Sequence, residues 1–129
     1  MSRVGGVVPD SYGLSLTVTV PAASATNPVH TDELLVFATT GPYQAAKAPA
    51  GTGVVLKAKH PVTDALEPLG VHVYGYSRVD KFTFSGDAPA IGASVESAGD
   101  GTVRTAAAAN GSFVLYVDTA RSYVEVAMP

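Results

Sequence analysis

The sequence predicts an all-β protein: a small antiparallel β-sandwich, jelly roll or β-barrel-like domain with an extended N-terminal arm. Three observations predict this class. Residues that suit a pleated strand are abundant, and the 129 residues include 19 Val. The 13 Gly and 9 Pro are spread along the chain and separate it into short segments. Several segments alternate apolar and polar residues with the period of two that half-buried strands show, and none has a helical period long enough for a βαβ unit.

Composition excludes several classes of protein. The formal net charge is -3 and charged residues make up 15% of the chain, so no basic surface is expected to drive nucleic-acid binding. The absence of Cys excludes disulfides, zinc-thiolate sites and a cysteine nucleophile. The longest apolar run, residues 34–38, is far shorter than the roughly 18 residues of a membrane span. Residues 1–6 lack the apolar core of a secretory signal, so we expect the protein to stay in the compartment where it is made.

The N-terminal arm comprises residues 1–13, and residues 14–129 are expected to form a single β domain. Gly and Pro interrupt any regular pattern in the arm, and a frayed terminus is one interpretation. Exposed apolar side chains are costly in a free tail, so the other interpretation is an arm that orders on a partner. Its candidate contact residues are Val4, Val7, Val8 and Tyr12.

The first strands follow from alternation. Residues 14–20 form the clearest one, with Leu14, Leu16, Val18 and Val20 predicted in the core, and Pro21 ends it. A loop over 21–31 leads to a short apolar strand over 34–39. Residues 40–53 are expected to be a long connection with room for one helical turn at 43–48 between two prolines.

The middle of the chain alternates again. Residues 54–60 predict a strand with Leu56 in the core, and the proline-bracketed residues 61–68 predict a loop. Residues 71–79 predict one continuous strand that buries Val71 and Val73 and places His72, Tyr74 and Tyr76 on the opposite face. That face is either an ordinary solvated surface or an aromatic strip that meets a partner. His72, Tyr74 and Tyr76 are therefore candidate contact residues, and Tyr43, in the connection over 40–53, is a further candidate.

The last third predicts short strands over 81–85, 93–96, 102–105, 113–118 and 123–127. Gly99-Asp100-Gly101 suits a tight hairpin, and Asn110-Gly111 suits a turn before the strand that carries Val114 and Tyr116. About nine short strands are typical of a sandwich, a jelly roll or a small barrel.

Motifs for catalysis or metal binding are weak. His30 lies near Asp32 and Glu33, a mixture that suits a divalent ion but equally an ordinary polar loop. Residues 75–79 match a nucleophile elbow at three positions and lack its final glycine. No glycine-rich phosphate loop occurs, and the sequon Asn110-Gly111-Ser112 is better interpreted as a turn. We therefore expect no enzyme activity, catalytic residue, metal or cofactor.

The order of segments from Ala48 to Val126 resembles the small decoration, or cement, proteins of tailed-bacteriophage heads. The segments that carry the resemblance are residues 51–56 (GTGVVL), 68–71 (PLGV), 89–95 (PAIGASV), 99–103 (GDGTV) and 113–117 (FVLYV). The long connection over 41–53 departs from the family pattern. The resemblance implies a structural virion protein on the outer surface of the expanded capsid, made in the bacterial cytoplasm. It implies binding to the major capsid protein and to itself, as a homo-dimer or homo-trimer, with no nucleic acid or membrane as partner.

Two other functions stay open from the sequence: another virion β-domain, such as a fibre or tail-associated one, and a carbohydrate-binding jelly roll. A lectin needs an aromatic platform, which Tyr74, Tyr76 and His72 would supply, although the chain has no Trp. A decoration protein is instead expected to form symmetric oligomers and to bind no small ligand. The candidate capsid or oligomer contacts are Val4, Val7, Val8, Tyr12, Tyr43, His72, Tyr74 and Tyr76.

Overall fold

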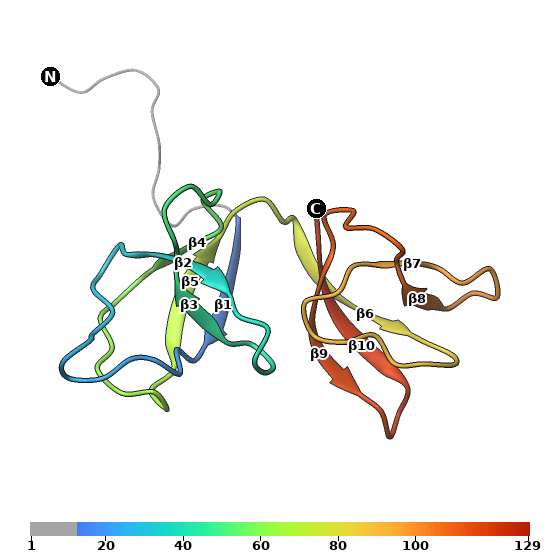
Figure 1. The fold of residues 1–129 in the computed structure, drawn as a ribbon, viewed down its shortest axis with the longest axis horizontal. Coiled ribbons are helices and arrows are strands. Elements are labelled where there is room, and N and C mark those ends of the chain that lie inside the picture. Colours follow the sequence, from blue (N-terminus) through green and yellow to red (C-terminus); the bar gives the residue numbers. More distant parts are fainter. Residues whose placement is uncertain (1–12) are drawn as a thin grey trace, which may run out of the picture.

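The computed structural model describes residues 13–129, so the arm residues Val4, Val7, Val8 and Tyr12 lie outside the described part. The described chain is all-β, as predicted, and Figure 1 shows two halves joined by an arching connection after β5. Its strands are β1 (Leu14–Val18), β2 (Leu34–Phe37), β3 (Ala45–Lys47), β4 (Leu56–Ala58), β5 (Leu69–Val73), β6 (Arg78–Thr83), β7 (Val95–Ser97), β8 (Val103–Thr105), β9 (Phe113–Asp118) and β10 (Tyr123–Met128).

The first half is a small barrel. Its five strands pair antiparallel in the order β1-β5-β4-β2-β3. A parallel bridge between Thr19 and Gln44 joins the two outer strands, where the Thr19 N–H donates to the Tyr43 carbonyl at 3.0 Å and the Ala45 N–H donates to the Thr19 carbonyl at 2.9 Å. Alternate residues of β4 and β5 point inward, because side chains on a strand alternate between faces. Leu56, Leu69 and Val71 are thereby fully buried in the barrel core.

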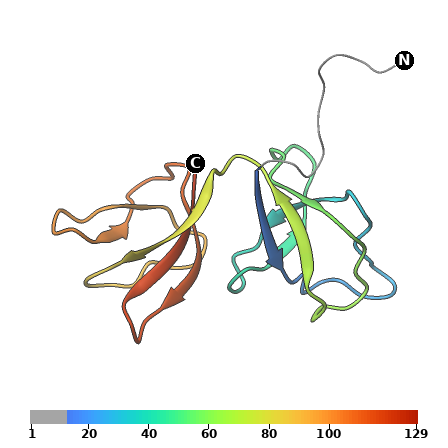
Figure 2. The same ribbon diagram turned by 180° about the vertical axis from the view of Figure 1, so that it is seen from behind.

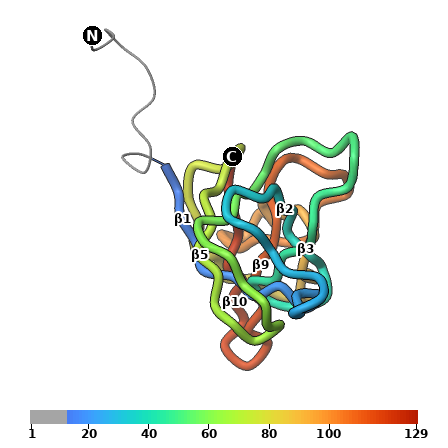
Figure 3. The backbone as a smooth tube through the Cα atoms, turned by 90° about the vertical axis from the view of Figure 1, so that its left-hand side faces the viewer, coloured from blue at the N-terminus to red at the C-terminus, as the bar shows by residue number. Residues whose placement is uncertain are grey.

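The second half is a three-stranded antiparallel sheet in the order β6-β10-β9, with the β7–β8 hairpin against one of its faces. The hairpin turns at residues 99–101, as the sequence predicted. Gly99 and Gly101 both have a positive φ there. Phe84, Val95, Val124 and Val126 form a second core between the hairpin and the sheet. The other face of the same sheet is turned to the barrel, and Figure 3 shows β9 and β10 behind the barrel strands.

A β-bulge in β9 joins the two cores. Tyr116 pairs with Glu125 and Val114 pairs with Val126, which leaves Leu115 as the extra residue. Val114 is buried in the second core, whereas Leu115 is 1% exposed and lies in the barrel core. The alternation predicted that Val114 and either Tyr116 or one of its neighbours are buried. Val114 is buried, and beside it the neighbour Leu115 is buried while Tyr116 is half-buried, because the bulge shifts the phase.

The remaining core predictions divide by position. Val18, Val20, Leu56, Val71 and Val73 are buried, as predicted. Leu14 and Leu16 are only partly buried, although they pack against the barrel core, because β1 is an edge strand. The strands at 113–118 and 123–127 are confirmed, the latter with one more residue.

The predicted continuous strand over 71–79 is wrong. β5 ends at Val73, Gly75 adopts φ +83, and β6 begins at Arg78 in a different sheet. Alternation alone gave no sign of the break, because Tyr76 and Arg78 keep the period across it. Gly75 was the signal, since a positive φ suits glycine and takes the chain out of the first sheet. His72 and Tyr76 therefore do not share one strand face.

The connection over 40–53 contains a strand that the sequence did not predict. β3 occupies Ala45–Lys47, where one helical turn was considered, and pairs with β2. Its first residue, Ala45, is fully buried in the barrel core. Short Ala-rich segments carry little intrinsic strand preference, so pairing with β2 and the bridge to Thr19 decide its conformation.

Gly92 is a close contact between the halves. It has φ +92, and a Cβ placed on it would meet Thr39 Cγ2 of the barrel half at 2.5 Å. Gly99 has a similar φ of +91 but open space around it. We therefore expect Gly92→Ala to lower the free energy of unfolding by about 2–4 kcal/mol and Gly99→Ala by about 1 kcal/mol. Urea unfolding of both variants checks this, and equal losses would show that no close packing exists at Gly92.

Candidate attachment surface

Two of the four described candidate contact residues lie in the seam between the halves. The Tyr76 ring lies 5.9 Å from that of Phe37, and Phe37 stacks on Phe113 of β9 at 5.4 Å between ring centroids. Tyr76 is half-buried and packs against the barrel core. The ring thus contributes to holding the barrel against the sheet.

Tyr43 links three parts of the chain. Its hydroxyl donates to Glu125 Oε1 of β10 at 2.5 Å, its N–H donates to the Leu115 carbonyl at 3.3 Å, and its carbonyl accepts the bond from Thr19. The residue has φ +51, a left-handed conformation that is uncommon for a bulky side chain. These bonds on both halves hold the backbone in that conformation.

Burial raises the pKa of the Tyr43 hydroxyl well above its ordinary value of 10.0, and the hydrogen bond to Glu125 adds to the rise. The folded state therefore keeps a proton that the unfolded chain releases near pH 10. Its contribution to stability is complete below pH 10 and decreases as pH rises above that value. We expect urea unfolding to show a smaller loss of stability between pH 8 and pH 11 for Tyr43→Phe than for the natural protein. Parallel losses would contradict this role.

His72 and Tyr74 lie on the outside of the barrel. His72 is the last residue but one of β5 and is level with Ser15 of β1 and Lys57 of β4. The Lys59 ammonium donates to Ser15 Oγ at 2.8 Å, so the stripe around His72 is polar. Tyr74 follows the end of β5 and is 40% exposed, while its N–H donates to the Val55 carbonyl at 2.7 Å. Its ring is thus presented from a fixed backbone.

The two most exposed large apolar side chains of the described residues, Val54 and Leu66, lie at opposite ends of the barrel, and Leu34, which is 42% exposed, lies between them, level with Lys57 of β4. At one end, Val54 is 58% exposed. It lies close to Tyr74, because the Tyr74 N–H donates to the carbonyl of the following residue, Val55. At the other end, Leu66 is 86% exposed in the loop before β5. The five residues of β5 separate these ends by about 17 Å at 3.3 Å per residue. Sequence reasoning missed Val54 and Leu66, and Leu66 between two loop prolines was the available signal.

The residues of the weak catalytic and metal-binding motifs form hydrogen bonds and ion pairs within the fold. The His30 N–H donates to Glu33 Oε1 at 2.9 Å, and Glu33 forms an ion pair with Lys47 at 3.3 Å. His60 Nε2 accepts the Gly70 N–H at 3.1 Å. Among residues 13–129 no three His, Asp or Glu side chains gather as a metal site. Asn110 folds its amide inward onto the Val95 carbonyl at 2.7 Å, as a turn residue does.

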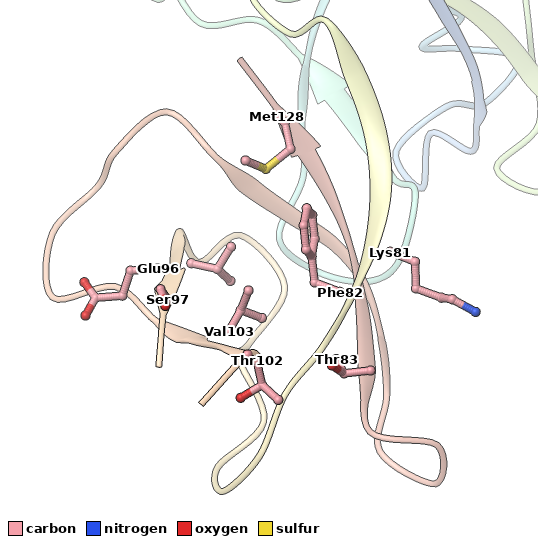
Figure 4. A pocket seen from close by; sticks show the side chains of 10 residues that line it. Lys81, Phe82, Thr83, Glu96, Ser97, Thr102, Val103 and Met128 are labelled. Atoms are coloured by element: carbon pink, nitrogen blue, oxygen red, sulfur yellow. The ribbon is translucent and has the colours of Figure 1, made fainter. Parts of the chain in front are cut away.

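An open groove of about 550 Å³ lies between the hairpin and the sheet. Figure 4 shows Phe82 and Met128 from the sheet facing Val103 from the hairpin, with Lys81 directed to the other side of β6. Val95 completes the apolar lining, and Glu96 and Thr102 lie at the rim. This lining can accept apolar side chains from an extended segment.

Comparison with known proteins finds no protein-family model that matches the chain and no curated protein with significant similarity to it. The part of the chain that the structure describes contains no helix able to cross a membrane.

Proposed function

We propose that the protein is a structural component of a bacteriophage head, which binds the outer surface of the expanded capsid and links neighbouring major-capsid subunits. The link stabilises the head against the internal pressure of packaged DNA. The proposal combines the sequence resemblance with one structural observation: exposed apolar side chains at opposite ends of a barrel that is bonded to a second sheet. A body with two separated contact points can touch two neighbours at once.

Such a bridge binds more tightly than either of its contacts would alone. Each contact is small, but binding of one end raises the effective concentration of the other end at its own site. Tyr74 and Val54 supply one contact, Leu66 supplies the other, and His72 lies on the strand between them. Association of copies with one another, as a dimer or trimer, places these contacts in a symmetric arrangement.

Apolar attachment predicts a weak salt dependence. The net charge of -3 supplies no long-range attraction to an acidic capsid. Raising the salt concentration from 0.1 to 1 M shortens the Debye length from about 10 Å to about 3 Å and weakens only charge pairs.

Co-sedimentation with purified expanded capsids tests the proposal, with unexpanded capsids and a glycan array as comparison arms. We expect saturable binding to expanded capsids whose affinity changes less than tenfold between the two salt concentrations. Glycan binding without capsid binding would replace the proposal with a carbohydrate-binding function. A hundredfold loss at high salt would show that charged residues carry the attachment.

A further inference from the structure

The outer edge of β6 lacks a strand partner over most of its length in the described chain. β10 pairs with its inner side, and on its outer side there is a single bridge, between Phe84 and Val103. The Phe84 N–H donates to the Ser122 carbonyl at 3.0 Å, so by alternation the N–H and C=O groups of Val79 and Lys81 point away from β10. Figure 2 shows β6, in yellow, along the margin of its sheet. These outward groups can pair with a strand of another molecule.

The edge carries one positive and one negative side chain on the same side of the sheet. Phe82 belongs to the second core, so Arg78 and Asp80, which alternate with it, lie on the hairpin side. Arg78 forms no ion pair with another described residue. Asp80 Oδ1 accepts the Lys81 N–H at 2.8 Å, which leaves Oδ2 for a further partner. The Lys81 ammonium does not take that place, because it lies on the other side, 4.8 Å from the centre of the Tyr123 ring.

These charges select one way in which two identical edges can pair. Charged side chains normally keep edge strands apart, because like charges meet when a strand pairs with its own copy. Two-fold axes beside Arg78, Asp80 or Lys81 each bring two like charges opposite each other. An axis beyond Lys81 moves the second copy onto Phe84, where the bridge already occupies the edge. An axis beside Val79 instead places Arg78 of each copy opposite Asp80 of the other.

We propose that two copies of the protein associate through the outer edges of β6, antiparallel and related by a two-fold axis beside Val79. The Val79 N–H of each copy donates to the Val79 carbonyl of the other. Arg78 of each copy forms an ion pair with the free carboxylate oxygen of Asp80 of the other. The two β6-β10-β9 sheets then continue into one another as a single antiparallel sheet.

A two-fold contact of this kind is closed, so it gives a dimer and neither a trimer nor a filament. The paired segments are short compared with the about 20–30 residues a side of a standard interface, so we expect a weak dimer that forms at submillimolar to millimolar concentration. The inference rests on the proposed function only in giving a surface to the self-association included there. Its tests use the free protein, so their failure would be distinguishable from a failure to bind capsids.

Disulfide trapping between two single-cysteine variants tests the register, since the natural chain has no Cys. In the proposed dimer, Arg78 and Asp80 of the other copy form a non-hydrogen-bonded pair whose Cα atoms lie about 4.5 Å apart, within disulfide range. The variants Arg78→Cys and Asp80→Cys are oxidised separately and as an equimolar mixture at submillimolar concentration. In the mixture, each linked pair keeps one natural contact between Arg78 and Asp80.

We expect at least tenfold more disulfide-linked dimer in the mixture than in either variant alone, because identical positions lie two residues out of register. Mass spectrometry of the linked peptides identifies the bond between positions 78 and 80. Equal linking in all three samples, or none in any, would overturn the proposal. Preferential linking of either variant with itself would also overturn it, because the strands would then pair in another register.

Charge reversal gives a second test that needs no cysteine. Arg78→Asp or Asp80→Arg alone places like charges opposite each other, so we expect self-association, measured by sedimentation velocity, to weaken at least tenfold. The double variant restores opposite charges and should associate like the natural protein. Asp87→Arg, in the exposed turn after β6, changes the net charge as Asp80→Arg does and should have no effect. A double variant as weak as the single ones, or a natural protein that stays monomeric at millimolar concentration, would overturn the proposal.

Discussion

Leu115→Ala is expected to lower the free energy of unfolding by about 2–5 kcal/mol, the range for removing a buried leucine side chain. Leu115 is 1% exposed and belongs to the barrel core, although it comes from β9 in the other half. The substitution therefore leaves a cavity in the barrel and also weakens the attachment of the sheet. Urea unfolding, followed by circular dichroism, measures the loss.

A matched leucine supplies the control. Leu66→Ala removes the same atoms from a side chain that is 86% exposed, so we expect a change within about 0.5 kcal/mol. A loss below about 1 kcal/mol for Leu115→Ala would contradict the bulge that directs this side chain into the barrel. A loss of the expected size, together with a broadened or divided transition, would show that Leu115 couples the two halves.

The second large effect concerns capsid binding. We expect either Leu66→Ser or Tyr74→Ser alone to weaken binding to expanded capsids on the order of a hundredfold, because each removes the larger apolar side chain from one end of the bridge. Both side chains are exposed, so the thermal transition should change little. Thr63→Ser in the same exposed loop is the matched control and should bind like the natural protein. Binding isotherms on capsids measure all three.

Comparison of the single variants with the double variant shows whether the two ends act as one bridge. If the two ends act as one bridge, the double variant retains no measurable binding. Natural affinity in both single variants would show that the ends of the barrel are not the attachment points, even where the protein binds capsids.

Sequence reasoning succeeded where strands obey local rules. Alternation identified β1, β4 and the end of β5 from Val71, and the Asp-Gly pair located the β7–β8 turn, because register and turn conformation are encoded within a few residues. The all-β class followed from the abundance of strand-favouring residues and from the Gly and Pro residues that divide the chain into short segments. These features depend little on contacts between distant segments.

It failed where distant contacts decide the structure. β3 forms because β2 and Thr19 pair with it, and the bulge at Leu115 arises because one sheet meets two cores. The aromatic residues show the same limit. Spacing grouped Tyr76 with Tyr74, but the change of sheet at Gly75 puts Tyr76 against Phe37 and leaves Tyr74 exposed.

Electron cryo-microscopy of expanded capsids saturated with the protein tests the central proposal most directly. We expect each copy to lie across the boundary between two major-capsid subunits, with the Tyr74 end of the barrel on one subunit and the Leu66 end on its neighbour. Copies seated within a single subunit, or capsids without added density at saturating protein, would contradict a function in linking the shell.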